Sequence, residues 1–356
     1  MSLEVLSPKR PMSNSTPRCK VFGECGGCEY QDLTYRTELQ FKEAQIKSQF
    51  QEFGFKKNIF KPIIASLKHY GYRTRLDLNL LKTRKTNEIF MGFMPAGRFH
   101  ILEVNECPIA RDEISNFIPT LRKQAVAKLP EDYRLANLTV KTGADGRVFW
   151  GGIGRRSLRM GEKDYLWAVI NKKKIFYSTE TFFQINHDIL PKAVKAIEKL
   201  LNLNKQSIFL DLYGGVGLFA VLFSRQVKQA YMIEEVKSSI QLAHYNMAQH
   251  RLKNMTIVEG KVENEIDSLK KEYRQNKKVI ALVDPPRKGL SDNARKSLSG
   301  ATFLKRLVYM SCNPETLVRD LMAFVKKGWQ VKEIQPMDFF PRTRHMEVLV
   351  LMTPKK

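Results

Sequence analysis

The stretch YMSCNPETLVRDL, residues 309–321, organises the predicted fold. The apolar run that ends at Met310 is typical of a buried strand. A helical pattern begins at Pro314, because proline is favoured just inside a helix start, where its missing N–H would be unpaired anyway. Cys312 therefore falls where a strand ends and a helix begins. In open α/β sheets, that position faces the ligand cleft.

Cys312 is a candidate nucleophile. The N-terminus of a helix favours the thiolate over the thiol, and the thiolate is the reactive form. A buried structural cysteine is the commoner role for a single Cys. The remaining motifs of the chain favour the reactive role.

Strands and helices alternate from residue 176 onward, which predicts right-handed crossovers and a parallel sheet. The expected strands are short apolar segments separated by lengths of chain sufficient for a helix. They cover Ile208–Leu212, Ala230–Glu234, Met255–Val258, Val279–Asp284, Arg306–Met310, Trp329–Ile334 and Val348–Met352.

Three of these strand ends carry groups suited to an adenosine cofactor. The first strand runs into DLYGGVG, residues 211–217, whose glycines let the backbone approach a ligand where a helix starts. The second ends at Glu234, placed to bind ribose hydroxyls. The strand before Asp284 ends in an acidic-proline turn, DPPR. The glycine pattern suits S-adenosylmethionine better than a dinucleotide.

The composition indicates a nucleic-acid partner. The 356 residues carry a formal net charge of +24, spread over the whole chain, with a pI of about 9.8. A folded protein this positive most plausibly meets a polyanion. No apolar run approaches the roughly 20 residues of a spanning helix, and the N-terminus does not resemble a signal peptide. We therefore expect no membrane association and a cytoplasmic location.

Three of the five cysteines form a C-x5-C-x2-C loop at Cys19, Cys25 and Cys28. A fourth ligand would have to be Cys107 or Cys312. Such thiolates suit zinc or an iron–sulfur cluster, and the spacing does not decide between them.

Four regions follow from these patterns. We expect a disordered lead over 1–18, a cysteine loop and amphipathic helix over 19–62, a mostly antiparallel β domain over 63–175 with one helix near 112–128, and the cofactor domain over 176–356. The β domain interleaves basic residues such as Arg73, Arg75, Arg155 and Arg156 with aromatic ones, a combination that can hold phosphates and stack bases. Alternatively, these basic residues form a charged sheet face that is exposed to solvent and binds no RNA.

Taken together, the motifs resemble those of the RNA uracil-5 methyltransferases, which make 5-methyluridine. The resemblance extends from Cys19 almost to the C-terminus. It rests on the cysteine loop, DLYGGVG, DPPRKG, SCNPxTL at 311–317 and HME at 345–347, together with Phe183-Gln184-x-Asn186.

This resemblance implies a class I methyltransferase sheet, with six parallel strands and an antiparallel seventh. It implies that Cys312 attacks C6 of uracil and that Glu347 removes the C5 proton. By the same route, Gln184, Tyr213, Glu234 and Asp284 would contact S-adenosylmethionine. Cys19, Cys25, Cys28 and Cys107 would ligate a [4Fe–4S] cluster. It also implies that the 34–53 helix packs on the catalytic domain.

The expected substrate is 23S rRNA, since cluster-bearing bacterial relatives mostly act there; tRNA stays open. Two rivals remain: a non-catalytic RNA-binding or assembly factor, and a methyltransferase that acts on an exocyclic amine. We expect a monomer. The sequence does not identify the modified uridine, the number of sites or the task of the cluster.

Overall fold

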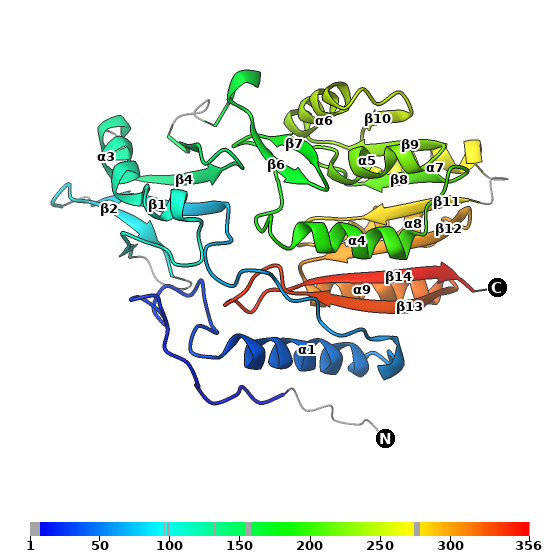
Figure 1. The fold of residues 1–356 in the computed structure, drawn as a ribbon, viewed down its shortest axis with the longest axis horizontal. Helices are drawn as coiled ribbons and strands as arrows, with labels where there is room; N and C mark the ends of the chain where they lie inside the picture. Colours follow the sequence, from blue (N-terminus) through cyan, green and yellow to red (C-terminus); the bar gives the residue numbers. More distant parts are fainter. Residues whose placement is uncertain are drawn as a thin grey trace.

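A seven-stranded sheet forms the C-terminal part of the computed structural model, which describes residues 8–83, 85–95, 97, 100–131, 133–153, 158–273 and 278–355 (Figure 1). Its order is β10-β9-β8-β11-β12-β14-β13. β14 runs antiparallel to both neighbours, and the other six strands run in one direction, as the family resemblance implied. The strands are β8 (Ile208–Leu212), β9 (Gln229–Glu234), β10 (Met255–Glu259), β11 (Val279–Val283), β12 (Leu304–Ser311), β13 (Trp329–Met337) and β14 (Glu347–Pro354).

Helices cover both faces of this sheet, because its strands are apolar on both sides. One face packs against α4 (Leu190–Leu201), α5 (Leu218–Phe223), α6 (Lys237–Gln249) and the hairpin of β6 (Leu166–Ile170) and β7 (Lys173–Tyr177). The other packs against α7 (Val262–Tyr273), α8 (Asp292–Ser299), α9 (Pro314–Lys326) and α1 (Tyr35–Glu52). The helix predicted over 34–53 therefore packs on the catalytic domain, as the family resemblance implied.

A separate antiparallel sheet, ordered β3-β2-β1-β4-β5, lies beside the large one (Figure 1). Leu76, Leu78 and Leu80 of β1 point into its core, while the alternate residues face outward. The single helix expected near 112–128 is divided in two, and Pro119 lies in the first turn of the second part. The elements are β1 (Arg75–Lys82), β2 (Ile89–Phe93), β3 (Leu102–Glu103), α2 (Asp112–Ser115), α3 (Ile118–Lys128), β4 (Leu135–Thr142) and β5 (Val148–Gly151).

The β6–β7 hairpin lies within the 63–175 range apart from its last two residues, yet it packs into the core of the large sheet. Leu166, Ile170 and Ile175 are fully buried there with residues of α4 and α5. Short 3-10 helices cover Lys57–Ile59, Glu162–Asp164 and Ser224–Gln226. No helix in the described part of the chain has the length and apolar character needed to cross a bilayer.

Part of the segment expected to be disordered makes defined contacts. Arg10 donates to both oxygens of Asp32, and Ser13 also donates to that carboxylate. Ion pairing and side-chain hydrogen bonds, rather than an apolar run, hold these residues, so hydrophobic patterning could not reveal them. Residues 1–7 of that lead lie outside the described residues, as do Arg155 and Arg156 of the predicted RNA-binding set.

Candidate active site

Cys312 lies between β12 and α9, as predicted. Asn313 is the N-cap of α9 and accepts a hydrogen bond from the backbone N–H of Glu315, and Pro314 occupies the first turn. The Ser311 hydroxyl accepts from the N–H of Asn313, which fixes the turn on the other side of the cysteine. The thiol is thereby held on a rigid strand end, partly exposed at the edge where the parallel strands terminate.

Glu347 is the first residue of β14 and lies beside Cys312. Ser311 pairs with Val348 in the antiparallel register of β12 and β14. The next residues in each direction, Cys312 and Glu347, are therefore opposite one another at the end of this ladder. Glu347 is 4% exposed, and its Oε2 has no hydrogen-bond partner within the described chain. A buried carboxylate oxygen without a partner is costly and marks a functional position.

Burial raises the pKa values of the acids at this site. Burial, followed by the charge of Asp284, raises the pKa of Glu347 well above its usual value. Burial also raises the pKa of Asp284 to about 7. The pKa of Cys312 is raised to about 12, first by burial and then by the charge of Glu347. Strongly perturbed groups that share one cleft are typical of catalytic sites.

Arg287 opposes this effect at the cysteine. It donates a hydrogen bond to Cys312 and lowers its pKa, although burial outweighs this influence. The backbone carbonyl of Arg287 accepts from the Asn313 side-chain amide at 3.1 Å and from the Thr316 hydroxyl at 3.2 Å. The loop after β11 is thus tied to the start of α9. The motif DPPRKG contains this arginine, but the sequence pattern did not indicate a role for it.

The same loop requires glycine at position 289. Gly289 has φ +71°, and an added Cβ would come within 2.7 Å of Arg319 Nη2 and Asp320 Oδ2. Asp320 is fully buried and accepts from the N–H of Leu290 at 2.8 Å. This close packing fixes the loop that carries Asp284 and Arg287.

The glycine-rich turn after β8 is shaped by Glu234. Its Oε2 accepts from the N–H of Gly215 at 2.9 Å, and its Oε1 accepts from the N–H groups of Glu235 and Val236 at the same distance. Tyr213 precedes the glycines with a left-handed φ of +62°. Non-glycine residues seldom adopt this conformation, and strain of this kind is concentrated at functional turns.

Asp211, within β8, is a site residue for which sequence reasoning assigned no role. It is fully buried, and burial raises its pKa to about 8. Its Oδ2 accepts from the N–H of Ala220 at 2.7 Å, while its Oδ1 has no partner within the described residues. The signal was present, because an aspartate inside an otherwise apolar strand is unusual.

Gln184 comes from the segment between β7 and α4 and crosses to the same cleft. Its side-chain amide donates to Asp284 Oδ2 at 3.3 Å. Asn186, two residues later, donates to the Ser66 hydroxyl and to the Phe339 carbonyl, which holds this segment against the β13–β14 connection. The structure therefore places Tyr213, Glu234 and Asp284 at the C-terminal ends of β8, β9 and β11. Gln184 is bonded to Asp284, which interacts with Cys312 and Glu347.

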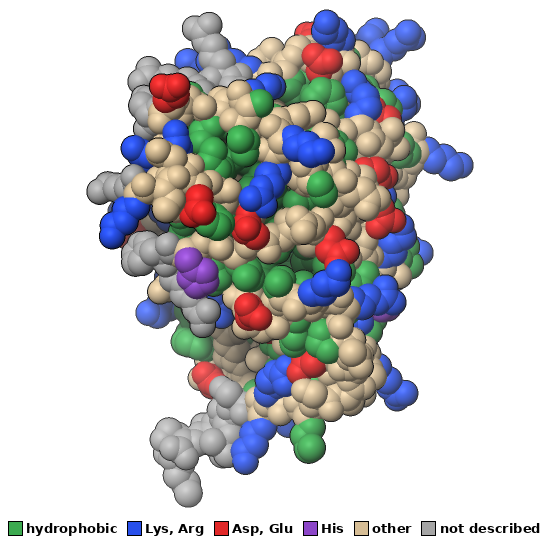
Figure 2. Space-filling model, turned by 90° about the vertical axis from the view of Figure 1, so that its left-hand side faces the viewer, with side chains coloured by type: hydrophobic (Ala, Val, Ile, Leu, Met, Phe, Trp, Pro, Cys, Tyr) green, Lys and Arg blue, Asp and Glu red, His purple; other side chains and the backbone are tan. Residues whose placement is uncertain are grey.

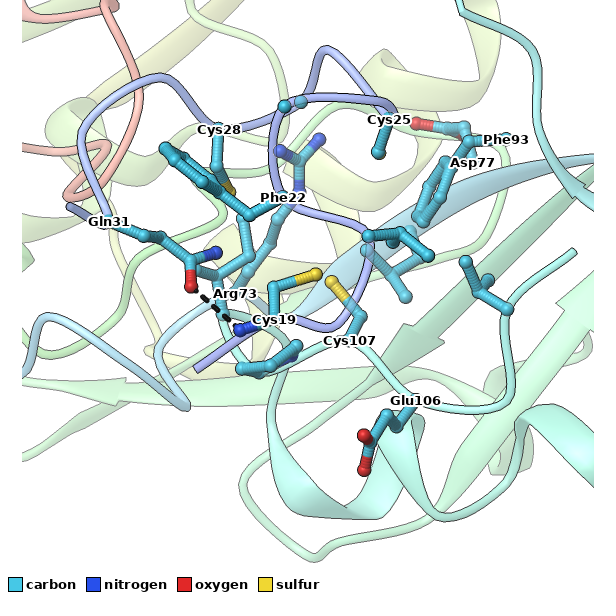
Figure 3. Close-up of a pocket in the computed structure, with 17 residues that line it drawn as sticks. Cys19, Phe22, Cys25, Cys28, Gln31, Arg73, Asp77, Phe93, Glu106 and Cys107 are labelled. Atoms are coloured by element: carbon cyan, nitrogen blue, oxygen red, sulfur yellow. Dashed lines mark hydrogen bonds between the residues drawn. The ribbon is translucent and has the colours of Figure 1, made fainter. Parts of the chain in front are cut away.

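The four remaining cysteines line one cavity of about 200 Å³, between the 19–28 loop and the β domain. Figure 3 shows the sulfurs of Cys19 and Cys107 directed toward each other, with Arg73 also at the cavity wall. Burial raises the pKa values of Cys25, Cys28 and Cys107. In the described part of the chain, no three His, Cys, Asp or Glu side chains gather closely enough to hold a single metal ion.

The fold is that of known methyltransferases. The tRNA (uracil-54, C5)-methyltransferase of Pyrococcus abyssi, solved in complex with S-adenosyl-L-homocysteine, superimposes with a TM-score of 0.70. The match covers 92% of this chain and 86% of that one at 21% identity. A sheet of this order, with helices on both faces, defines a class I methyltransferase fold.

The profile of the tRNA (Uracil-5-)-methyltransferase family matches residues 154–355. The chain therefore belongs to this family of S-adenosylmethionine-dependent RNA methyltransferases. The tRNA (uracil(54)-C(5))-methyltransferase of Schizosaccharomyces pombe is 27% identical over 99% of this chain and 68% of its own length. An uncharacterized RNA methyltransferase of Clostridium acetobutylicum is 27% identical over 97% of this chain and 85% of its own.

Proposed function

We propose that this protein methylates C5 of a uridine in RNA through a transient bond between Cys312 and C6 of the base. The observation that carries this proposal is the opposition of Cys312 and Glu347 across the β12–β14 ladder, with Asp284 beside them. A nucleophile paired with a buried carboxylate suits methylation at carbon. Methylation of an exocyclic amine would need no thiol.

The reaction begins with the sulfur of Cys312. C5 of uracil is a poor nucleophile, so the thiolate adds to C6 and the electron pair of the double bond becomes available at C5. C5 then takes the methyl group from the sulfonium of S-adenosylmethionine, and S-adenosylhomocysteine is left. The Glu347 carboxylate removes the C5 proton. The C–H electron pair restores the double bond, and the C6–S pair returns to Cys312.

The charge of the cofactor makes this chemistry compatible with the raised pKa values. A cation close to an acid lowers its pKa, and the sulfonium of bound S-adenosylmethionine is such a cation. Its presence favours the thiolate of Cys312 and the carboxylate forms of Asp284 and Glu347. Binding of the cofactor would therefore prepare the cysteine for reaction.

Four residues are proposed to hold the cofactor, namely Gln184, Tyr213, Glu234 and Asp284. Glu234 is at the end of the second strand in chain order, where carboxylates bind ribose hydroxyls in related sheets. It already holds the glycine turn through the N–H of Gly215. The ribose would therefore bind next to a turn whose shape this carboxylate sets.

The RNA is proposed to lie against the β domain and the cleft. Figure 2 shows Lys and Arg side chains spread over this side of the molecule, with Asp and Glu side chains and hydrophobic patches between them. A target uridine must leave its stack, or come from a loop, to reach Cys312. The family resemblance favours 23S rRNA, whereas the names of the fission-yeast and archaeal relatives favour tRNA. Both RNAs belong in the assay.

A [4Fe–4S] cluster is proposed to bind Cys19, Cys25, Cys28 and Cys107. The four thiols line one cavity, but they are not gathered as a single ion requires. A cluster holds its four thiolates farther apart than one ion does, because a cube of iron and sulfide stands between them. Bound there, the cluster would cross-link the 19–28 loop to the β domain, and coordination would ionise the buried thiols.

Trapping with 5-fluorouridine tests the methyl-transfer proposal. RNA transcripts of 23S rRNA fragments and of tRNA, with 5-fluorouridine in place of uridine, are incubated with the protein and S-adenosylmethionine. Fluorine cannot leave as a proton does, so a stable protein–RNA adduct is expected on denaturing gels. Cys312→Ala should form none and should not methylate natural RNA. Methylation of natural RNA by that variant would contradict the proposal, and binding without product would favour the non-catalytic rival.

A further inference from the structure

A buried ionic network joins α1 to the connection between β13 and β14. We call it the Lys42 network, and it consists of Glu38, Lys42, Asp338 and Arg342. Lys42 Nζ lies 2.8 Å from Glu38 Oε1, 2.8 Å from Asp338 Oδ1 and 3.1 Å from the Phe340 carbonyl. All three donors of the ammonium group are therefore used.

The network is sealed from water, although Glu38 Oε2 and Arg342 Nε have no hydrogen-bond partner within the described residues. Lys42, Glu38 and Asp338 are each 0% exposed, and Arg342 is 4% exposed. The N–H of Arg342 donates to Glu38 Oε1 at 2.7 Å, and its guanidinium lies 3.3 Å from Glu38 Oε2. Two carboxylates and two cations balance one another. Burial alone would lower the pKa of Lys42, but the two carboxylates outweigh it and raise that pKa.

This network lies in the connection between β13 and β14, next to the residue pair that contains Glu347. Met337 is the register partner of Glu347, so the two residues form the closing pair of β13 and β14. Asp338 follows Met337 directly, and Arg342 is in the middle of the connection. Arg342 adopts a left-handed φ of +70°, which a non-glycine residue keeps only when its surroundings impose it. The bonds to Glu38 and to the Leu33 carbonyl do so.

Other groups hold the remaining side of the same connection. Asn186 donates to the Phe339 carbonyl at 3.0 Å, and the Tyr72 hydroxyl donates to the Pro341 carbonyl at 3.0 Å. Loss of the Lys42 ammonium would therefore shift the connection rather than release it. Buried ion pairs contribute little net stability compared with apolar replacements, and their best-attested use is to specify one geometry.

We propose that Lys42 is a positioning residue for Glu347: it fixes the β13–β14 connection so that the carboxylate meets the C5 proton of the methylated base. This inference rests on the proposed function, in which Glu347 is the base. Half of the network, on α1, lies outside the residues that the family profile matches. The N-terminal helix thereby takes part in catalysis without touching the substrate.

The test compares Lys42→Met with Lys47→Met in the full-length protein. Lys47 is on the same helix, but it is partly exposed and pairs with Glu43. Misplacing a reacting group by about 1 Å can cost on the order of 100-fold in rate. We therefore expect Lys42→Met to lower kcat between about 10- and 100-fold, with the KM values for RNA and S-adenosylmethionine changed less than about twofold. Lys47→Met should match the wild type.

A second readout separates positioning from general damage. If only proton removal is slowed, the methylated protein–RNA adduct should accumulate with natural RNA, as a slowly migrating band that contains the labelled methyl group. A folded Lys42→Met protein that turns over normally, or that is slow without accumulating this adduct, would overturn the proposal. If Lys42→Met does not fold, Asp338→Asn, which keeps the shape of the side chain, decides by the same two readouts.

Failure of the proposed function would look different. In that case the wild-type protein would form no adduct with 5-fluorouridine RNA, whatever the behaviour of the Lys42 variant. If the wild type forms the adduct and Lys42→Met behaves like Lys47→Met, only the positioning role is refuted.

Discussion

Cys312 and Glu347 face one another at the open end of the β12–β14 ladder, one residue beyond the paired Ser311 and Val348. This opposition exists because β14 runs antiparallel to β12, so its first residue lies where β12 ends. In an all-parallel sheet, the last strand would start at the opposite edge, away from the end of β12. The reversed strand thus brings a carboxylate to the cysteine without any long loop.

Glu347→Gln should trap the reaction after methyl transfer. The amide keeps the size of the side chain but cannot accept the C5 proton, and general-base catalysis contributes about 10²–10⁴-fold. We expect turnover to fall by at least about 100-fold and a methylated covalent adduct to be visible on denaturing gels. Glu259→Gln, at the exposed end of β10, is the matched control and should be silent. Normal product release by Glu347→Gln would exclude it as the base.

Arg287→Met should make Cys312 less reactive. The arginine donates a hydrogen bond to the thiol and lowers its pKa, so its loss raises that pKa further. The fraction of thiolate at a given pH falls, and alkylation by iodoacetamide slows with it. We expect a decrease of about tenfold for a pKa shift of about one unit. Mass spectrometry of the peptide that contains Cys312 measures this rate. Lys288→Met, on the same loop, provides the control, and an equal decrease in both would argue against a specific contact.

Cys28→Ser should remove the metal centre and leave Cys312 untouched. The wild-type protein is expected to contain iron and acid-labile sulfide, and the variant is expected to lose both. Cys312→Ser should keep the full metal content, because that cysteine lies in the other site. Iron, sulfide and zinc assays on the three proteins decide the matter. A colourless wild-type protein with one zinc per chain would refute the cluster.

Asp211→Asn should stabilise the cofactor-free protein at alkaline pH. Burial raises the pKa of Asp211 from 3.8 to about 8, so the folded protein binds a proton that the unfolded chain releases. The stability that this proton provides is complete below pH 3.8 and is lost as the pH rises through about 8. Asparagine can still accept from the N–H of Ala220 and does not titrate.

The difference in melting temperature between Asp211→Asn and the wild type should therefore increase from pH 5 to pH 8.5. We expect the variant to gain at least about 2 °C over that interval. Thermal melts without cofactor at both pH values provide the measurement. A difference that is independent of pH would show that the carboxyl group does not change its protonation as described.

Much of the large sheet could be predicted from sequence because each strand is a short apolar run between recognisable turns. The expected segment Ile208–Leu212 coincides with β8, and the remaining strands differ from prediction only at their ends. Strand ends depend on local hydrogen bonds that periodicity does not encode. The position of Glu347 beside Cys312 followed from the family resemblance, which supplied the antiparallel strand.

Other parts of the site depend on contacts that no local pattern records. Lys42 and Glu38 are on α1 among other polar residues, and helical spacing does not distinguish them from charges exposed to solvent. They are fully buried because Asp338 and Arg342 approach from the far end of the chain. The role of Arg287 likewise depends on how its loop is tied to Asn313 and Thr316.

The Lys42–Asp338 contact joins residues that are 296 positions apart in the chain. During translation, α1 leaves the ribosome long before its charged partner has been made, and chains generally fold in the order of their synthesis. Until Asp338 has been synthesised, the ammonium group of Lys42 stays hydrated, and α1 cannot pack in its final position. The connection that precedes Glu347 is thus among the last parts of the protein to form.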